Sequence, residues 1–159
     1  MLTIKPLDLN CLQDTQALIN LLSDYALDPM GGGQALAESS KQNLVAQLKK
    51  RTDYVGWLAL DNTKAVGLLN AFEGFSTFYA KPLLNIHDLT VQTAYRGKGI
   101  ALKLMQTAEA YARTQGYCKL TLEVLDENIV AKNLYQKMGF EAYQLAETAG
   151  VAKFWEKPL

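Results

Sequence analysis

The alternation of apolar and polar positions at the start of the chain predicts one strand and two helices. LTIKPL (residues 2–7) alternates as a half-buried strand does. Apolar side chains then recur at helical spacing, as Leu12, Leu18, Ile19, Leu22 and Tyr25, after Asp8 or Asn10 as N-cap. The glycine-rich loop DPMGGG (28–33) ends this helix. A second helix, with Ser39 or Ser40 as N-cap, is expected to run to Lys49–Arg51.

The rest of the chain predicts a series of strands interrupted by two helices. We expect a hairpin over 54–72 with its turn at 61–63, a strand over 83–91, a helix over 99–114 closed by Gly116, a strand over 119–124, a helix from Asn128 to Gly139, and closing strands FEAYQL (140–145) and VAKFWEKP (151–158). This order predicts a mixed α/β fold, with a mostly antiparallel sheet and one parallel β-α-β crossover. Its length of 159 residues fits a single domain, 1–159.

Composition narrows the function classes. Sixteen basic and sixteen acidic residues balance, which argues against a general nucleic-acid or membrane-surface binder. Cys11 and Cys118 are far apart and His87 is the single histidine, so no metal site is expected. The N-terminus lacks a signal-peptide pattern, and no apolar run approaches the roughly 20 residues of a membrane span. We therefore expect a cytoplasmic protein with reduced thiols.

AYRGKGIALKLM (94–105) carries the clearest chemistry. A strand precedes it and a helix follows, and Gly97 and Gly99 stand at the helix start. Helix N-termini offer unpaired N–H groups to phosphate, and glycine lets a ligand approach the main chain closely. A plain basic turn is the alternative from these residues alone. The stretch does not fit the P-loop, which needs Ser or Thr after Gly-Lys, nor the dinucleotide fingerprint, because residue 102 is Leu102.

The pattern Arg-x-x-Gly-x-Ala, from Arg96 to Ala101, resembles the coenzyme A pyrophosphate loop of the GNAT N-acetyltransferases. LDENIVAKNLYQKMGFE (125–141) resembles that family's second cofactor motif, and the order of elements matches over almost the whole chain. The resemblance implies a splayed parallel strand pair that holds acetyl-CoA as co-substrate. The cofactor-binding residues that it implies are Leu89, Thr90, Val91, Arg96, Gly97, Lys98, Gly99, Ile100, Ala101 and Asn128.

The same resemblance implies two catalytic residues. Tyr135 occupies the usual position of the acid that protonates the leaving thiolate. His87 stands where polyamine-type members carry a glutamate base, and histidine changes charge near neutral pH. Structural alternatives stay open for each position: Tyr135 as a core residue, His87 as a strand histidine oriented by Asp88, and Asn128 as a helix N-cap.

The acceptor side is expected near the two N-terminal helices and the end of the third strand. The residues proposed to touch the acceptor are Tyr25, Asp28, Met30, Phe72 and Glu73, whose acidic members would suit a cationic amine. The overall hypothesis is an N-acetyltransferase that moves acetyl from acetyl-CoA to a primary amine of a small molecule or peptide, by direct attack in a ternary complex. A non-catalytic acyl-CoA-binding module of the same fold is the alternative. By analogy with the family, we also expect a homodimer.

Overall fold

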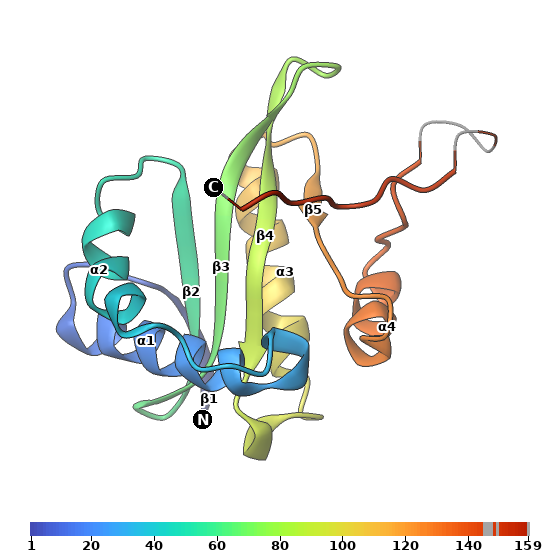
Figure 1. Ribbon diagram of the computed structural model, residues 1–159. Helices are drawn as coiled ribbons and strands as arrows, with labels where there is room; N and C mark the ends of the chain where they lie inside the picture. Colours follow the sequence, from blue (N-terminus) through green and yellow to red (C-terminus); the bar gives the residue numbers. More distant parts are fainter. Residues whose placement is uncertain (145–147, 149, 159) are drawn as a thin grey trace. The chain divides into compact units, whose positions relative to one another are not determined.

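The computed structural model of the protein describes residues 1–144, 148 and 150–158 (Figure 1). Contacts along the chain group it into two units, Met1–Leu122 and Glu123–Leu159. Each unit is described by itself, and the single domain expected from the length stays a prediction.

The first unit is built on a sheet of five strands. These are β1 (Leu2–Pro6), β2 (Tyr54–Asp61), β3 (Lys64–Ser76), β4 (Lys81–Val91) and β5 (Leu120–Leu122), and they lie side by side in that order. The first four pair antiparallel, and β4 pairs parallel with β5. The predicted sheet, mostly antiparallel with one parallel crossover, is therefore confirmed.

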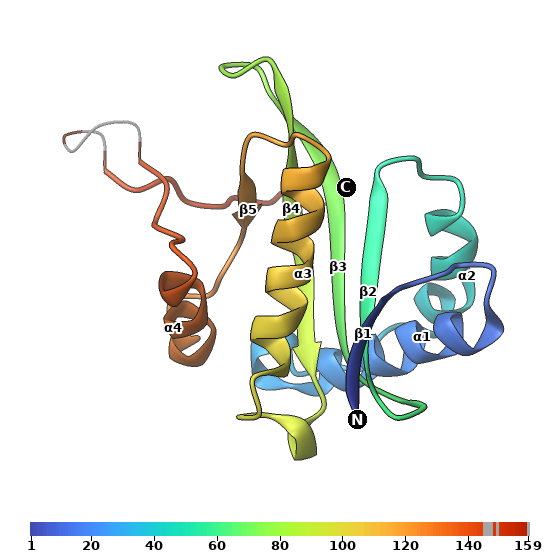
Figure 2. The ribbon, with the colours of Figure 1, turned by 180° about the vertical axis from the view of Figure 1, so that it is seen from behind.

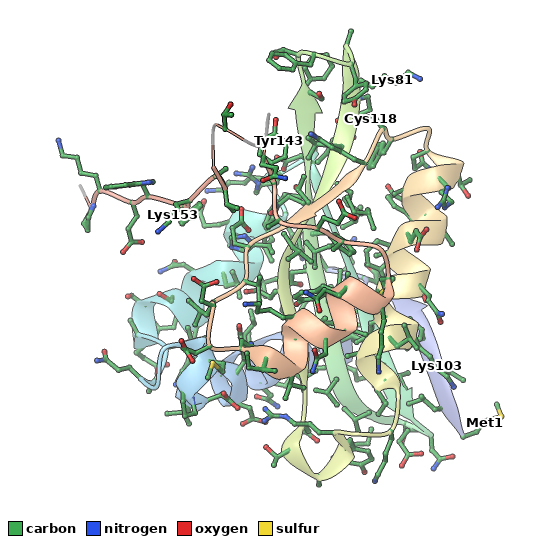
Figure 3. The ribbon with its side chains drawn as sticks, turned by 90° about the vertical axis from the view of Figure 1, so that its right-hand side faces the viewer. Met1, Lys81, Lys103, Cys118, Tyr143 and Lys153 are labelled. Carbon is green, nitrogen blue, oxygen red and sulfur yellow. The ribbon has the colours of Figure 1, made fainter. Side chains whose placement is uncertain are left out.

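Helices cover both faces of this sheet (Figures 1 and 2). On one face lie α1 (Leu12–Leu27) and α2 (Glu38–Leu48), and on the other lies α3 (Ile100–Thr114). The outer side of α3 is polar, with Lys103 exposed to solvent (Figure 3). Two single-turn 3₁₀ helices, η1 (Pro29–Gly31) and η2 (Thr93–Tyr95), follow α1 and β4.

Each face of the sheet has its own core. Leu18 and Leu21 of α1 pack against Leu58 and Leu68 of the sheet, and all four are buried. Burial of each such side chain contributes about 1.5–3 kcal/mol. On the other face α3 lies very close to β3 at Gly67, where a Cβ would stand 3.2 Å from Ile100 Cγ2 and 3.3 Å from Leu104 Cδ1. The glycine therefore sets how closely the start of α3 approaches the sheet.

The end of α3 confirms the expected glycine cap. Gly116 has a left-handed φ of 75°, its N–H donates to the carbonyl of Arg113 (3.1 Å), and the N–H of Tyr117 donates to that of Ala112 (2.9 Å). These two bonds form a Schellman motif, which satisfies carbonyls that the helix leaves unpaired.

The second unit contains α4 (Ile129–Lys137). Asn128 is its N-cap, because the side-chain Oδ1 accepts the N–H of Ala131 at 3.2 Å. Gly139, with φ 86°, ends the helix, and the N–H of Phe140 donates to the carbonyl of Tyr135 at 2.9 Å. The helix expected between Asn128 and Gly139 is therefore confirmed.

The closing pair of strands is not formed in the described residues. Within 140–144 and 151–158 no strand is present, and one backbone bond joins Ala152 N–H to the carbonyl of Tyr143 (2.8 Å). Leu145 lies outside the described residues. The alternating pattern of these segments does not by itself supply a partner strand, and Phe154 and Trp155 stay exposed.

The expected N-caps of the first two helices are also wrong. Cys11 and Ala37 occupy those positions, without a side-chain cap. The Asp8 carboxylate accepts the N–H of Asn10 (2.8 Å) and so shapes the turn before α1. Local acceptor residues identified the turn before α1 correctly, but they placed the start of α1 too early and the start of α2 too late.

Candidate functional site

The C-terminal half of β4 has an open edge. The strand pairs with β5 only from Leu84 to Ile86, whereas β4 continues to Val91. On the β5 side, the part of the chain that the structure describes provides no strand for residues 87–91. Main-chain N–H and C=O groups on such an edge need partners, and a ligand can supply them. Leu89, Thr90 and Val91 lie on this stretch, as expected.

The turn after β4 presents its main chain to the outside. Gly97 (φ 74°) and Gly99 (φ 75°) both have left-handed backbone conformations, and a Cβ at either position would meet no atom within 4 Å. Gly99 is the N-cap of α3, and no side chain caps the helix. The first N–H groups of the helix, from Ile100 onward, have no intrahelical acceptor and carry the positive end of the dipole. This arrangement suits an anion such as pyrophosphate.

The two cations of the turn are folded back onto the protein. Arg96 donates from Nε to the carbonyl of Val91 (3.0 Å) and from Nη2 to Asp28 Oδ2 (2.8 Å). Lys98 donates from Nζ to the carbonyl of Ala94 (3.0 Å) and lies 5.0 Å from the centre of the Tyr95 ring. The main chain is thus the part of the turn that is free to receive a ligand.

A cavity of about 440 Å³ lies between the end of α1 and the end of β4. Apolar and polar side chains share its lining, which consists of Leu21, Asp24, Leu27, Asp28, Thr90, Val91, Gln92, Thr93, Ala94 and Arg96. The predicted acceptor residue Asp28 and the predicted cofactor residues Thr90, Val91 and Arg96 therefore border the same space.

The loop DPMGGG folds tightly against the last turn of α1. Asp28 Oδ1 accepts the N–H of Met30 (2.9 Å), and its main-chain carbonyl accepts those of Gly31 (2.8 Å) and Gly33 (3.0 Å). A Cβ at Gly31 would stand 2.0 Å from the carbonyl oxygen of Tyr25, so a side chain does not fit there. The loop is therefore sharply bent at this point.

This loop brings together three of the predicted acceptor residues. Tyr25 donates its hydroxyl to the carbonyl of Met30 (3.4 Å), and Asp28 lies between them in sequence. The Met30 amide and then the Arg96 guanidinium hold the pKa of Asp28 below its usual value, so this carboxyl is ionised at neutral pH. Burial, with the nearby Asp88 and Asp28 carboxylates, raises the pKa of Tyr25.

A hydrogen-bonded polar row crosses the sheet on its α1 face. Tyr54 donates its hydroxyl to Asn70 Oδ1 (2.8 Å), and Asn70 Nδ2 donates to Asp88 Oδ2 (2.9 Å). Burial and then the Asp88 charge raise the pKa of Tyr54. Sequence reasoning missed Asn70 and Tyr54, although a lone asparagine inside the apolar run LLNAF was a usable signal.

His87 sits in a β-bulge of β4. On the neighbouring strand β3, Asn70 pairs with Asp88 and the next residue, Ala71, pairs with Ile86. His87 therefore has no partner residue on β3 and is the extra residue of the bulge. The side chain is exposed, and its ring meets Phe72 edge-on at 5.3 Å between centroids. Since Phe72 packs with the α1–α2 core, the predicted base and the predicted acceptor residue Phe72 share that face.

Glu73 is not brought to this group. Successive strand residues point to opposite faces, and Glu73 accepts the hydroxyl of Tyr117, which follows α3, at 2.6 Å. Burial and this carboxylate raise the pKa of Tyr117. The α3 side of the sheet thus holds Glu73, opposite to Phe72.

The remaining two predicted residues lie in the second unit. Asn128 is the N-cap of α4, which is the structural role expected as its alternative to a cofactor contact. The ring centre of Tyr135 lies 5.8 Å from that of Phe140. The capping role is confirmed, while the cofactor contact of Asn128 and the acid role of Tyr135 stay predictions.

Comparison with known proteins agrees with this geometry. A family model described as "Acetyltransferase (GNAT) family" matches residues 16–140. The chain belongs to the GNAT family. Members of this family use acetyl-CoA, which fits the open main chain at the start of α3.

Two curated GNAT relatives and one solved structure illustrate the similarity. Human N-acetyltransferase 8B is 33% identical over 85 residues, covering 54% of this chain and 37% of the relative. Streptothricin acetyltransferase of Streptomyces lavendulae is 40% identical over 76 residues, covering 48% and 40%. The chain thus spans well under half the length of these two relatives. The crystal structure of an aminoglycoside acetyltransferase, meta-AAC0020 from an uncultured soil metagenomic sample, in complex with sisomicin, matches with a TM-score of 0.79 and 20% identity, covering 99% and 97%.

Three further properties of this GNAT member concern the described residues. They hold no group of three or more His, Cys, Asp or Glu side chains placed to bind a metal ion. None of the helices described has both the length and the apolar character needed to cross a membrane. Cys11 and Cys118 are free thiols.

Proposed function

We propose that this protein transfers an acetyl group from acetyl-CoA to a primary amine of a small molecule or peptide, by direct attack in a ternary complex. The observation that carries the proposal is the uncapped start of α3, with Gly97 and Gly99 open to the outside, beside the open edge of β4. In an otherwise well-paired sheet, both features supply main-chain partners to one extended ligand.

On the donor side, the N–H groups from Gly97 to Ala101 would hold the pyrophosphate. The main chain of Leu89, Thr90 and Val91 would bind the pantetheine arm, with Asn128 as a further contact. Arg96 and Lys98 contribute less in this proposal, since both side chains already have partners.

The acceptor amine must lose a proton before it can attack. A lysine-like amine near pKa 10.4 costs about 4–5 kcal/mol to deprotonate at pH 7, at roughly 1.4 kcal/mol per pKa unit. His87 would take this proton, directly or through water, and the neutral amine nitrogen would attack the thioester carbonyl. The nitrogen, positively charged in the tetrahedral intermediate, would release a second proton to solvent. As the carbon–sulfur bond breaks, Tyr135 would donate its proton to the leaving thiolate and regain one from solvent.

The acceptor class is supported by the acidic groups of the α1 side. Asp24 and Asp28 line the cavity, and Asp88 lies on the same face of the sheet as His87 and Phe72. Carboxylates favour the binding of a cationic substrate. An aminoglycoside acetyltransferase among the structural neighbours was solved with sisomicin, and another neighbour is a ribosomal-protein-alanine N-acetyltransferase, so the proposal includes both small-molecule and peptide amines.

The test is thiol release from acetyl-CoA in the presence of primary amines, polyamines, aminoglycosides, amino acids and peptides. Calorimetry with acetyl-CoA alone runs in parallel. We expect turnover with at least one small cationic amine. Tight acetyl-CoA binding without turnover across the panel would instead assign the protein as an acyl-CoA-binding module. The cytoplasmic location and the homodimer stay predictions.

The acid role of Tyr135 has a direct test in Tyr135→Phe. Loss of general acid catalysis typically costs 10²–10⁴-fold in rate, so we expect kcat to fall about 100-fold or more. The Kd of acetyl-CoA should change less than about threefold, because the ring remains. Equal kcat in the variant would remove Tyr135 from the mechanism.

Gly99→Val tests the main-chain cradle. A β-branched residue at φ 75° is strained by about 1–2 kcal/mol, and its side chain would project into the open space beside the cradle. We expect calorimetry to show the Kd of acetyl-CoA rising at least about tenfold in Gly99→Val. In Lys98→Ala the same Kd should rise less than about threefold. The reverse ranking would mean that side-chain charge holds the cofactor.

A further inference from the structure

Two side-chain hydrogen bonds join the end of α1 to the end of β4. Arg96 Nη2 donates to Asp28 Oδ2 at 2.8 Å, and Gln92 Nε2 donates to Asp24 Oδ2 at 3.3 Å. Both pairs line the cavity of about 440 Å³. The shorter of the two bonds is the ion pair of Arg96 with Asp28, and Arg96 belongs to the motif assigned to the cofactor.

Asp28 organises the loop at the other end of this tie. One carboxylate oxygen accepts the N–H of Met30 and the other accepts Arg96, while the main-chain carbonyl accepts Gly31 and Gly33. The side chain and the main-chain carbonyl of Asp28 together accept three N–H groups of the loop 28–33. A side chain that fixes Asp28 therefore fixes where Met30 and the Tyr25 hydroxyl lie.

Arg96 already has two protein partners in this arrangement. Its Nε donates to the carbonyl of Val91 and its Nη2 to Asp28, so its charge is matched by a carboxylate. A phosphate near Arg96 would therefore compete with the Asp28 carboxylate for the guanidinium charge. The fork of the guanidinium instead joins the last residue of β4 to the loop after α1.

We propose that Arg96 is a positioning residue for the acceptor, which holds the loop 28–33 against the end of β4 through Asp28. This inference rests on the proposed function, because it assigns the loop to the acceptor side of the same site. It reassigns Arg96 from phosphate binding to the geometry of the amine site.

The first experiment does not need activity. Hydrogen–deuterium exchange of the full-length Arg96→Ala variant should show the amides of Met30, Gly31 and Gly33 exchanging at least about fivefold faster. Amides near Leu18 in α1 should keep their wild-type rates. Arg113→Ala is the matched control, because it removes an arginine–carboxylate pair of similar geometry, with Glu109 (2.6 Å), from the exposed side of α3.

The second experiment separates the two substrates. Arg96→Ala should raise the KM of the best amine about five- to tenfold, with kcat and the Kd of acetyl-CoA within about twofold of wild type. Asp28→Asn should have a similar effect on KM. The double variant should then be no worse than the more affected single variant, since both changes break the same contact. Arg113→Ala should leave all three values unchanged.

Four outcomes decide whether the contact between Arg96 and Asp28 positions the loop. A Kd for acetyl-CoA that rises fivefold or more in Arg96→Ala, or unchanged exchange of the loop, would overturn the positioning role. Fully additive effects of the two variants on KM would do the same. If wild type turns over no amine but the loop still exchanges faster in Arg96→Ala, the proposed function fails while the tie between Arg96 and the loop is supported.

Discussion

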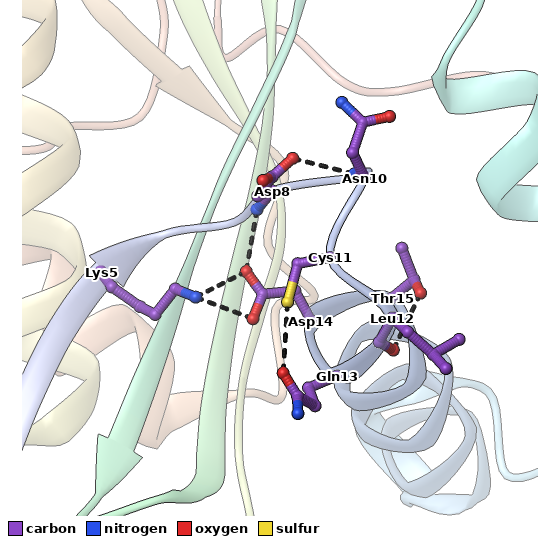
Figure 4. A network of polar contacts seen from close by, with 8 residues as sticks. All are labelled: Lys5, Asp8, Asn10, Cys11, Leu12, Gln13, Asp14 and Thr15. Atoms are coloured by element: carbon purple, nitrogen blue, oxygen red, sulfur yellow. Dashed lines mark hydrogen bonds and ion pairs between the residues drawn. The ribbon is translucent and has the colours of Figure 1, made fainter.

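The two ends of α1 are each held by a carboxylate and a cation, but in different surroundings. Near the N-terminal end, Asp14 accepts Lys5 Nζ on both oxygens at 2.8 Å and the N–H of Asp8 at 2.9 Å (Figure 4). Its side chain is 7% exposed. At the other end the Asp28 side chain is 19% exposed and its partner Arg96 is 48% exposed, beside a cavity.

The two ion pairs therefore have different roles: the Lys5–Asp14 pair stabilises the fold, and the Arg96–Asp28 pair positions a loop. Asp14 is buried and accepts both an ammonium and a main-chain N–H, so its loss would leave the Lys5 ammonium and the Asp8 N–H without this partner. Asp28 and Arg96 are reached by water and can be solvated when separated, so their pairing adds little to stability. The same type of ion pair therefore contributes to folding at one end of the helix and to the shape of a site at the other.

The largest effect is expected for Asp14→Ala. The variant removes the partner of Lys5 and the acceptor of the Asp8 amide from a buried position, so the free energy of unfolding should fall by about 2–3 kcal/mol. This value stays below that of a fully buried pair because Lys5 is 38% exposed and can turn to water. Denaturant unfolding measures the change.

Gln13→Ala is the matched control for that change. Gln13 is an exposed neighbour whose amide oxygen accepts only the weak Cys11 Sγ contact at 3.5 Å, so stability should stay within about 0.5 kcal/mol. Equal losses in the two variants would mean that helix content, and not the buried carboxylate, accounts for the effect.

An intermediate effect on the free energy of unfolding is expected when the Asp14 carboxylate is protonated in acid. Burial alone would raise the pKa of Asp14, but the hydrogen bond from Lys5 and the amide of Asp8 hold it below its usual value. A lowered pKa stabilises the fold above about pH 4, where the carboxyl of the unfolded chain is ionised. The contribution is lost as pH falls through the lowered folded value. The stability difference between wild type and Asp14→Asn should therefore shrink as the pH falls below about 4; a constant difference would contradict the charge argument.

The effect of Arg96→Ala on stability is expected to be much smaller than that of Asp14→Ala. Partly exposed ion pairs contribute about 0–1 kcal/mol, so unfolding by denaturant should change by less than about 1 kcal/mol even where the amine KM rises several-fold. A loss as large as that of Asp14→Ala would erase the distinction between the two ends of α1.

Local signals in the sequence were sufficient for several turns and helix ends of both units. Gly97 and Gly99 were expected to leave the main chain open to a ligand, and both have positive φ with no atom within 4 Å of a Cβ position. Gly116 and Gly139 ended their helices as expected, because a left-handed residue after a helix is nearly specific to glycine. The separation of Glu73 from Phe72 was also predictable, since neighbouring strand residues point to opposite faces.

Pairings between distant segments were not predictable in this way. Nothing local to Arg96 indicates Asp28 as its partner, and the positive charge beside two glycines suggested phosphate instead. The bulge at His87 arises from the register of β3 against β4, which a single strand does not reveal. The closing strands failed for a related reason, because alternation describes one strand and says nothing about its neighbour.

The distance along the chain between partners has a consequence for folding. Lys5 and Asp14 are 9 residues apart, whereas Asp28 and Arg96 are 68 apart. For a flexible chain, closing the longer loop costs about 2 kcal/mol more in entropy. The contact at the C-terminal end of α1 therefore gains most from strands that have already come together, and we expect it among the last to form. By the same reasoning it is among the first to open in the native protein, which would let an acceptor enter while the sheet stays intact.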